Sequence, residues 1–185
     1  MNLENILSIF HKKAVEHSIP YLIIGGFAAS YWGKPRFTAD IDYVIPKRCL
    51  DDALALFSEI KYKTEFIHPR KSFAHFVSEN NKSFKIDLML VDDGTWEKLN
   101  KDSSLAQFDS TDNLYPVVTA MHLIAMKLHA AKQEDREEYY KDLLDIAGIM
   151  KAQDIDLEML EKEGILPKHG SKKTIKILKD IIGSE

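Results

Sequence analysis

The fold is decided by residues 25–42, which read GGFAASYWGKPRFTADID. A short apolar strand is expected just before them, over residues 21–24, and a small-residue helix follows the glycine pair over residues 27–32. A second strand is expected over residues 39–45, where acidic and apolar residues alternate. A strand, a glycine turn, a helix and a second strand in this order predict an α/β unit.

The rest of the chain extends this unit and then becomes helical. The Asn80-Asn81 pair predicts a turn between two arms of a hairpin. From Pro116 onward apolar residues recur at helical spacing. We therefore expect an α/β domain over residues 1–115 and a helical region over residues 116–185. The other expected elements are helices at 3–17, 47–60, 136–150 and 171–182, and strands at 62–67, 73–78 and 84–91.

Composition excludes several classes of protein. The chain has 185 residues, 45% of them hydrophobic, which is enough for a packed core. Its net charge of −4 argues against a basic protein that binds long nucleic acids. The single cysteine excludes an internal disulfide framework and a cysteine-cluster zinc site. No signal peptide or membrane-length apolar run is visible, so we expect a cytoplasmic protein without membrane association.

Three aspartates lie on the expected strands. Asp40 and Asp42 are two residues apart on one strand, so their side chains project from the same face. Asp87 interrupts an otherwise apolar strand, where a lone carboxylate is costly without a partner. If the two strands are neighbours, the three carboxylates converge. Such hard oxygen ligands favour Mg²⁺ or Mn²⁺ over zinc, although a solvated edge strand would also explain Asp40 and Asp42.

The glycine pair has a complementary role. Gly25 and Gly26 lie between a strand and a helix, where backbone amides at the helix N-terminus favour an anion such as phosphate. A plain tight turn is the alternative explanation. Carboxylates for a metal ion and amides for a phosphate together predict metal-assisted phosphoryl or nucleotidyl transfer.

These motifs resemble the signature of the DNA polymerase β-like nucleotidyltransferase superfamily, and most closely the bacterial AbiEii/MenT-type nucleotidyltransferases. The similarity covers most of residues 20–150. It implies a nucleotidyltransferase-fold mixed β-sheet flanked by helices, followed by a C-terminal helical region that completes the cleft. The segments that carry it are Gly25-Gly26-Phe27-Ala28, Arg36-x-Thr38-x-Asp40-Ile41-Asp42, residues 123–128 and residues 141–146, with Arg136 between the last two.

The resemblance also implies residue roles. Asp40, Asp42 and Asp87 would bind the metal ions, and Asp87 would also help to activate the acceptor hydroxyl. A second group would bind the nucleotide, namely Gly25, Gly26, Arg36, Thr38, Lys127 and Arg136. Lys127 and Asp142 would belong to the catalytic set contributed by the helical region. We expect Asp145 to lie on an ordinary solvated helix face, or to pair with Arg136 or Lys141.

The expected activity is transfer of a nucleoside monophosphate from a nucleoside triphosphate (NTP), such as ATP, to a hydroxyl group. The acceptor would be an RNA 3′ end such as that of a tRNA, a protein or a small molecule. The resemblance further implies a toxin of a toxin–antitoxin system, with an antitoxin protein as partner. The alternative is a catalytically silent module of the same fold that binds a nucleotide or a regulatory partner.

Overall fold

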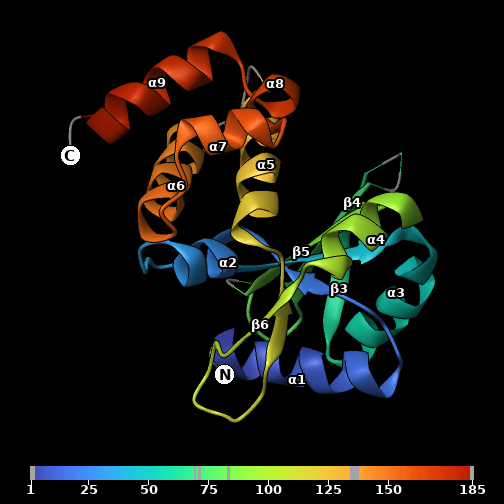
Figure 1. The fold of residues 1–185 in the computed structure, drawn as a ribbon. Helices are drawn as coiled ribbons and strands as arrows, with labels where there is room; N and C mark the ends of the chain where they lie inside the picture. The colour runs from blue at the N-terminus through green and yellow to red at the C-terminus, as the bar shows by residue number, and fades with distance from the viewer. Residues whose placement is uncertain (1–2, 69, 71, 83, 134–137, 184–185) are drawn as a thin grey trace. The chain divides into compact units, whose positions relative to one another are not determined.

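Figure 1 shows the fold in a computed structural model, which describes residues 3–68, 70, 72–82, 84–133 and 138–183. Contacts divide the chain into two compact units. The first consists of Met1–Ala28 and Phe37–Val118, and the second of Ala29–Arg36 and Thr119–Glu185. Helix α2, Gly25–Trp32, begins in the first unit and ends in the second.

The first unit is a mixed sheet with flanking helices, as the sequence predicts. Among the described residues the sheet has seven strands, in the order β3-β4-β5-β2-β1-β7-β6. Strand β2 runs parallel to β5 and β1 runs parallel to β7, while the other neighbours are antiparallel. The strands are β1 (Leu22–Ile23), β2 (Asp40–Pro46), β3 (Tyr62–Ile67), β4 (Phe73–Ser78), β5 (Lys85–Val91), β6 (Ser104–Ala106) and β7 (Tyr115–Val117). The helices are α1 (Leu3–Glu16), the 3-10 turn η1 (Lys47–Cys49), α3 (Leu50–Glu59) and α4 (Asp93–Lys101).

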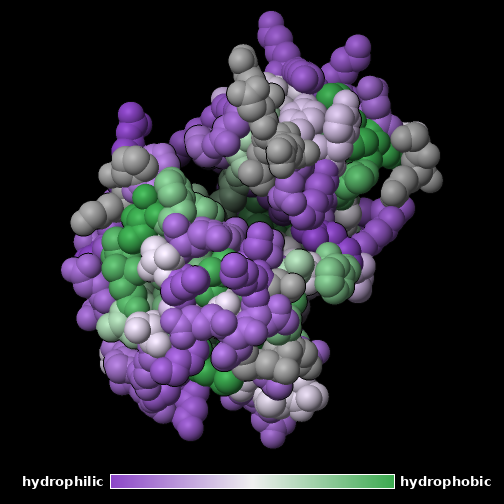
Figure 2. All heavy atoms as spheres, turned by 180° about the vertical axis from the view of Figure 1, so that it is seen from behind, coloured by the Kyte–Doolittle hydropathy of each residue, from purple (hydrophilic) through white to green (hydrophobic). Residues whose placement is uncertain are grey.

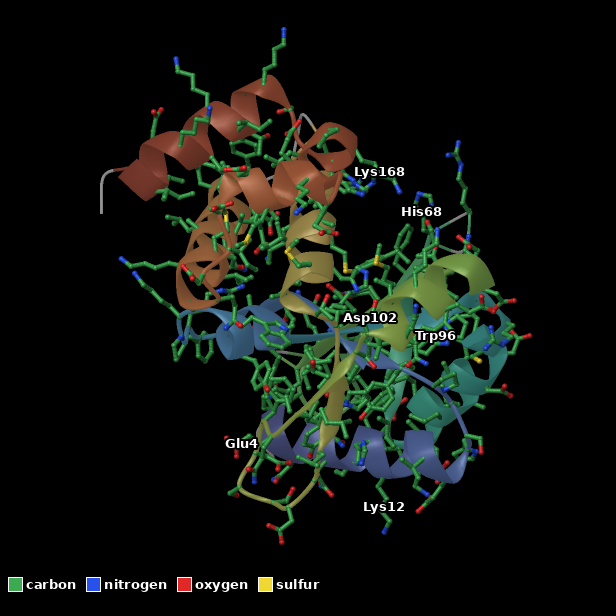
Figure 3. All side chains as sticks on the ribbon, in the orientation of Figure 1. Glu4, Lys12, His68, Trp96, Asp102 and Lys168 are labelled. Atoms are coloured by element: carbon green, nitrogen blue, oxygen red, sulfur yellow. The ribbon has the colours of Figure 1, made fainter. Side chains whose placement is uncertain are left out.

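Aromatic packing against α1 and α3 covers one face of the sheet. Phe10 of α1 stacks on Tyr43 of β2 with ring centroids 4.1 Å apart. Phe57 of α3 stacks on Phe76 of β4 at the same separation, and all four side chains are buried. Figure 3 shows the charged side chain of Lys12 on α1 pointing away from the sheet. Because side chains alternate along a strand, the residues between these aromatic positions project from the opposite face.

The helix expected from Pro116 begins later than the sequence indicates. Tyr115–Val117 forms β7, which pairs with β1 and β6. Helix α5 starts only at Ala120, after Thr119, whose side chain accepts the backbone N–H of His122 at 3.1 Å. The prediction was wrong for residues 116–119: Pro116 and Val117 lie in β7, Val118 donates its backbone N–H to Ile23, and Thr119 caps α5. Local periodicity does not reveal this pairing.

The second unit is helical among the described residues. Besides the end of α2, it contains five helices, which match the expected helical region. The start of the helix expected over residues 136–150 lies outside the described residues. The five helices are α5 (Ala120–Ala130), α6 (Tyr139–Ala152), α7 (Leu157–Lys162), α8 (Ile165–His169) and α9 (Lys172–Gly183).

Among the described residues, no helix combines the length and the apolar character needed to cross a membrane. The face of the molecule in Figure 2 mixes hydrophilic side chains with smaller hydrophobic patches.

Candidate active site

The register of β2 and β5 brings two carboxylates together. These strands are parallel neighbours, and Asp42 stands directly opposite Asp87. Strands in a sheet are about 4.8 Å apart, and paired residues project from the same face. Asp40 lies one pleat along β2 on that face, opposite Lys85. We call this face, which carries Asp40, Asp42 and Asp87, the carboxylate face.

Asp87 is partly buried, with its side chain 24% exposed. Burial raises the pKa of its carboxyl group, while His75 works in the opposite direction and the charge of Asp40 adds to the rise. His75 lies on β4 directly opposite Asp87, and its Nδ1 atom contacts Oδ1 of Asp87. Asp87 therefore holds its negative charge at a free-energy cost, which is expected of a carboxylate kept for function.

The glycine pair makes room for the side chain of Asp42. Gly25 has φ of +60°, a conformation that disfavours other residues. A Cβ atom at Gly25 would lie 1.9 Å from Oδ2 of Asp42, so no side chain fits there unless Asp42 moves. The backbone N–H of Gly26 donates to the same Oδ2 at 3.3 Å. The N-terminus of α2 thus faces an anionic group, here the Asp42 carboxylate.

Thr38 supports the start of β2. Its hydroxyl donates to the backbone carbonyl of Asp40 at 3.1 Å. This hydrogen bond shapes the chain just before the carboxylates, while the nucleotide contact expected of Thr38 stays a prediction.

The carboxylate face fits a divalent metal ion by residue type and strand register. Carboxylate oxygens are ligands that Mg²⁺ and Mn²⁺ prefer, and Asp42 and Asp87 are side by side. Within the described part of the chain, however, no three His, Cys, Asp or Glu side chains are arranged to hold a metal ion. The Asp42 carboxylate faces the Gly26 amide and the Asp87 carboxylate contacts His75. By residue type and register, Asp42 and Asp87 are the residues that would hold an ion, with Asp40 one pleat away on the same face.

The second unit holds a group of four charged side chains that are buried or partly buried. Lys127 of α5 is 8% exposed and lies between two carboxylates of α6. Its Nζ atom is 3.0 Å from Oδ1 of Asp142 and 2.7 Å from Oδ2 of Asp145. Arg36 binds Asp145 through two hydrogen bonds, from Nε at 2.7 Å and from Nη2 at 2.9 Å. We call Arg36, Lys127, Asp142 and Asp145 the ion-pair cluster.

The ion-pair cluster corrects the expectation for Asp145. The sequence suggested a solvated residue or a partner of Arg136 or Lys141, but the Asp145 side chain is only 7% exposed. Burial would raise the pKa of Asp145, yet the hydrogen bond from Arg36 and the charge of Lys127 outweigh it and lower the pKa. Lys141 instead pairs with Glu138 at 2.5 Å, and Arg136 lies outside the described residues.

Sequence reasoning also missed His75. A signal was available, because His75 and Asp87 each lie six residues from Asn81 in the predicted hairpin turn. Positions equidistant from a hairpin turn tend to face each other across the two strands. Counting from the turn would therefore have paired the histidine with the carboxylate. The hairpin itself is confirmed.

We predict that Gly25→Ala destabilises the protein through contact with Asp42. A double-mutant cycle in urea with Asp42→Gly should give a coupling free energy of about 0.5–3 kcal/mol, because the second change removes the colliding side chain. Backbone strain at positive φ should persist in the double variant. Purely additive effects would show that the Asp42 side chain does not require glycine at position 25.

We predict that Asp87→Asn raises the melting temperature in EDTA at neutral pH. Asparagine keeps the size and an acceptor for His75 but removes the half-buried charge whose burial raises the pKa of Asp87. Differential scanning calorimetry measures the change, with the exposed Asp112→Asn as the control. A melting temperature below that of the wild type would contradict a costly charge at Asp87.

We predict that Asp145→Asn lowers stability by about 3–5 kcal/mol at neutral pH, because it removes a charged partner from buried Lys127 and from Arg36. Because the pKa of Asp145 is lowered in the folded state, ionised Asp145 adds to the free energy of unfolding at any pH above its unfolded-state pKa. This contribution disappears as the pH falls through the folded-state pKa. The stability gap between the variant and the wild type should therefore narrow in acid. Urea unfolding at several pH values measures it, and a constant gap would contradict the pairing.

Several solved structures resemble this chain. The chain resembles, with TM-score 0.56 and 14% identity, an antigenic nucleotidyltransferase-like protein from Paracoccidioides brasiliensis, over 92% of this chain and 94% of that one. It resembles the antibiotic-resistance factor ANT(2'')-Ia with TM-score 0.58 and 12% identity, over 89% of this chain and 95% of that one. It resembles the lincosamide antibiotic adenylyltransferase LnuA with TM-score 0.52 and 16% identity, over 80% of this chain and 95% of that one.

These structural likenesses, at such low identity, show a shared nucleotidyltransferase fold. No curated protein sequence gives a significant match. The family model of the nucleotidyl transferase AbiEii toxin of type IV toxin–antitoxin systems matches residues 12–181. That match spans both the carboxylate face and the ion-pair cluster, and it confirms the family expected from the motifs. The chain is a nucleotidyltransferase that belongs to the AbiEii toxin family.

Proposed function

We propose that this protein transfers a nucleoside monophosphate from an NTP to a hydroxyl acceptor with the help of Mg²⁺ or Mn²⁺. The observation that supports this most directly is the pairing of Asp42 and Asp87 on adjacent parallel strands. Two ionised carboxylates held side by side repel each other, and a shared cation relieves that repulsion. Membership of a nucleotidyltransferase family gives the reaction class.

The reaction balances as a substitution at phosphorus. A bond forms between the acceptor oxygen and the α-phosphorus, the bond from that phosphorus to the bridging oxygen breaks, and pyrophosphate leaves. We assign the acceptor proton to the carboxylate of Asp87, since burial raises the pKa of that group and makes it a better base. A bound divalent cation would neutralise the charge that develops on the phosphate oxygens.

The triphosphate needs donors and positive charge. We propose that Gly25 and Gly26, at the N-terminus of α2, present backbone amides to it, in a position where the amide of Gly26 already binds an anionic oxygen. We further propose that Arg36, Thr38, Lys127 and Arg136 contribute to nucleotide binding, and that Asp142 acts with Lys127 in catalysis. The family match over residues 12–181 includes all of these positions, which supports the proposal.

The acceptor class follows from the family only in part. An RNA 3′ end, a protein and a small molecule each offer a hydroxyl group that fits the proposed reaction. The family description favours a toxin, and we propose an antitoxin as its partner in the cell. A small-molecule acceptor is the alternative that the structural neighbours suggest, because one of them is described with adenylyl-2''-tobramycin and another with lincomycin bound.

We predict that Asp42→Asn and Asp87→Asn each lower nucleotide transfer by at least about 100-fold, because each removes a charge that the reaction needs. Each NTP, labelled at the α-phosphate, is incubated with total RNA, with protein, and with aminoglycosides or lincosamides. Metal-free reactions and the exposed-site variant Asp112→Asn serve as controls. Transfer should require Mg²⁺ or Mn²⁺.

Full transfer activity in either aspartate variant would contradict the assignment. If the wild type binds NTP and metal but transfers nothing to any acceptor in the panel, the protein is instead a silent binding module of the same fold.

A further inference from the structure

His75 lies between two carboxylates on the carboxylate face. It occupies β4 opposite Asp87 of β5, which is in turn opposite Asp42 of β2. Its Nδ1 atom contacts Oδ1 of Asp87, and its Nε2 atom is 3.3 Å from Oε2 of Glu65 on β3. Four neighbouring strands thus place Glu65, His75, Asp87 and Asp42 in sequence across the sheet.

A local irregularity in β3 brings Glu65 to this position. The ladder with β4 pairs Thr64 with Phe76 and then Phe66 with His75, so Glu65 is an extra residue in the ladder. Both Glu65 and Phe66 therefore stand opposite His75. Bulges of this kind re-aim side chains and occur often beside active sites.

The two contacts of His75 differ in their exposure to solvent. The side chains of His75 and Asp87 are 19% and 24% exposed, whereas Glu65 is 58% exposed. Solvent weakens the contact with Glu65 more than the contact with Asp87, because water screens exposed charges. The half-buried His75–Asp87 contact is therefore the one with the larger effect on carboxylate orientation.

The His75–Asp87 contact occupies one carboxylate oxygen. An ionised carboxylate only accepts hydrogen bonds, so His75 presents its Nδ1–H to Oδ1 of Asp87, and the contact of Nε2 with Glu65 is an ion pair only when the imidazole is protonated. Oδ2 of Asp87 lies outside this contact. Metal-binding carboxylates are commonly fixed in this way by an outer hydrogen-bond donor, which limits the rotation of the ligand.

We propose that His75 is a positioning residue for Asp87, holding its carboxylate ready to bind a divalent cation, and that Glu65 orients the imidazole ring. The inference rests on the proposed function, in which Asp87 is a metal ligand and the base. The competing explanation is that His75 serves only to satisfy a half-buried carboxylate. The two explanations differ in the measured quantity that responds, which is cation affinity in the first case and stability alone in the second.

The test compares four variants by Mn²⁺ titration with electron paramagnetic resonance, without nucleotide. His75→Leu removes the donor and should weaken Mn²⁺ binding by about 10- to 100-fold. His75→Asn keeps an N–H close to the Nδ1 position and should restore most of the affinity. Glu65→Gln should have a smaller effect than His75→Leu, because Glu65 contacts only the far side of the ring.

His11→Leu is the matched control. His11 is also partly buried in the first unit and hydrogen-bonds through Nδ1, to the hydroxyl of Tyr21 at 2.6 Å. Its loss should lower the melting temperature in EDTA without changing Mn²⁺ affinity. In transfer assays, His75→Leu should lower kcat more than it changes the KM for the NTP, and His75→Asn should recover kcat.

Unchanged Mn²⁺ affinity in His75→Leu would overturn the inference, as would His75→Asn binding no better than His75→Leu. If the His75→Leu variant fails to fold, the other two variants decide. Weakened Mn²⁺ binding in Glu65→Gln together with near-normal Mn²⁺ binding in His75→Asn supports the proposal. Any other pattern in these two variants overturns it. A wild type that binds Mn²⁺ but transfers no nucleotide would remove the proposed function, while the affinities would still decide the role of His75. A wild type that binds no Mn²⁺ would overturn the inference.

Discussion

The parallel pairing of β2 with β5 is the constraint on which the candidate active site depends. It places Asp42 opposite Asp87, and the antiparallel pairing of β4 with β5 then adds His75. The opposite face of the same strands is buried against aromatic side chains of α1 and α3. Since a shift of one residue would exchange the two faces, core packing and carboxylate placement are fixed together.

The partly buried carboxylates of the two units differ in their partners. In the first unit, Asp87 is half-buried next to other carboxylates, so its pKa rises and its charge is unfavourable without a cation. In the second unit, the carboxylates of Asp142 and Asp145 have cationic partners in Lys127 and Arg36. The ion-pair cluster therefore contains both signs of charge, whereas the carboxylate face would need a bound cation, as the proposed function supplies, to relieve its repulsion.

The sequence correctly predicted the elements that are determined by local residue patterns. Alternation around Asp40 and Asp42 gave the strand and the shared face, and the Asn80-Asn81 turn gave the hairpin that carries Asp87. It failed where distant segments decide the outcome. Residues 115–117 form a strand because β6 and β1 pair with them, and the Asp145 side chain is shielded from solvent where Arg36, 109 residues away, binds it. His75 was overlooked although its distance from the turn matches that of Asp87.

The central claim is that Asp42 and Asp87 form a single divalent cation site. Isothermal titration of Mn²⁺ into the wild type, Asp42→Asn, Asp87→Asn and the double variant tests it most directly. If both carboxylates bind one ion, each single change should remove most of the binding and the double change should add little more. Independent losses that add in the double variant, or full Mn²⁺ affinity in either single variant, would contradict the account.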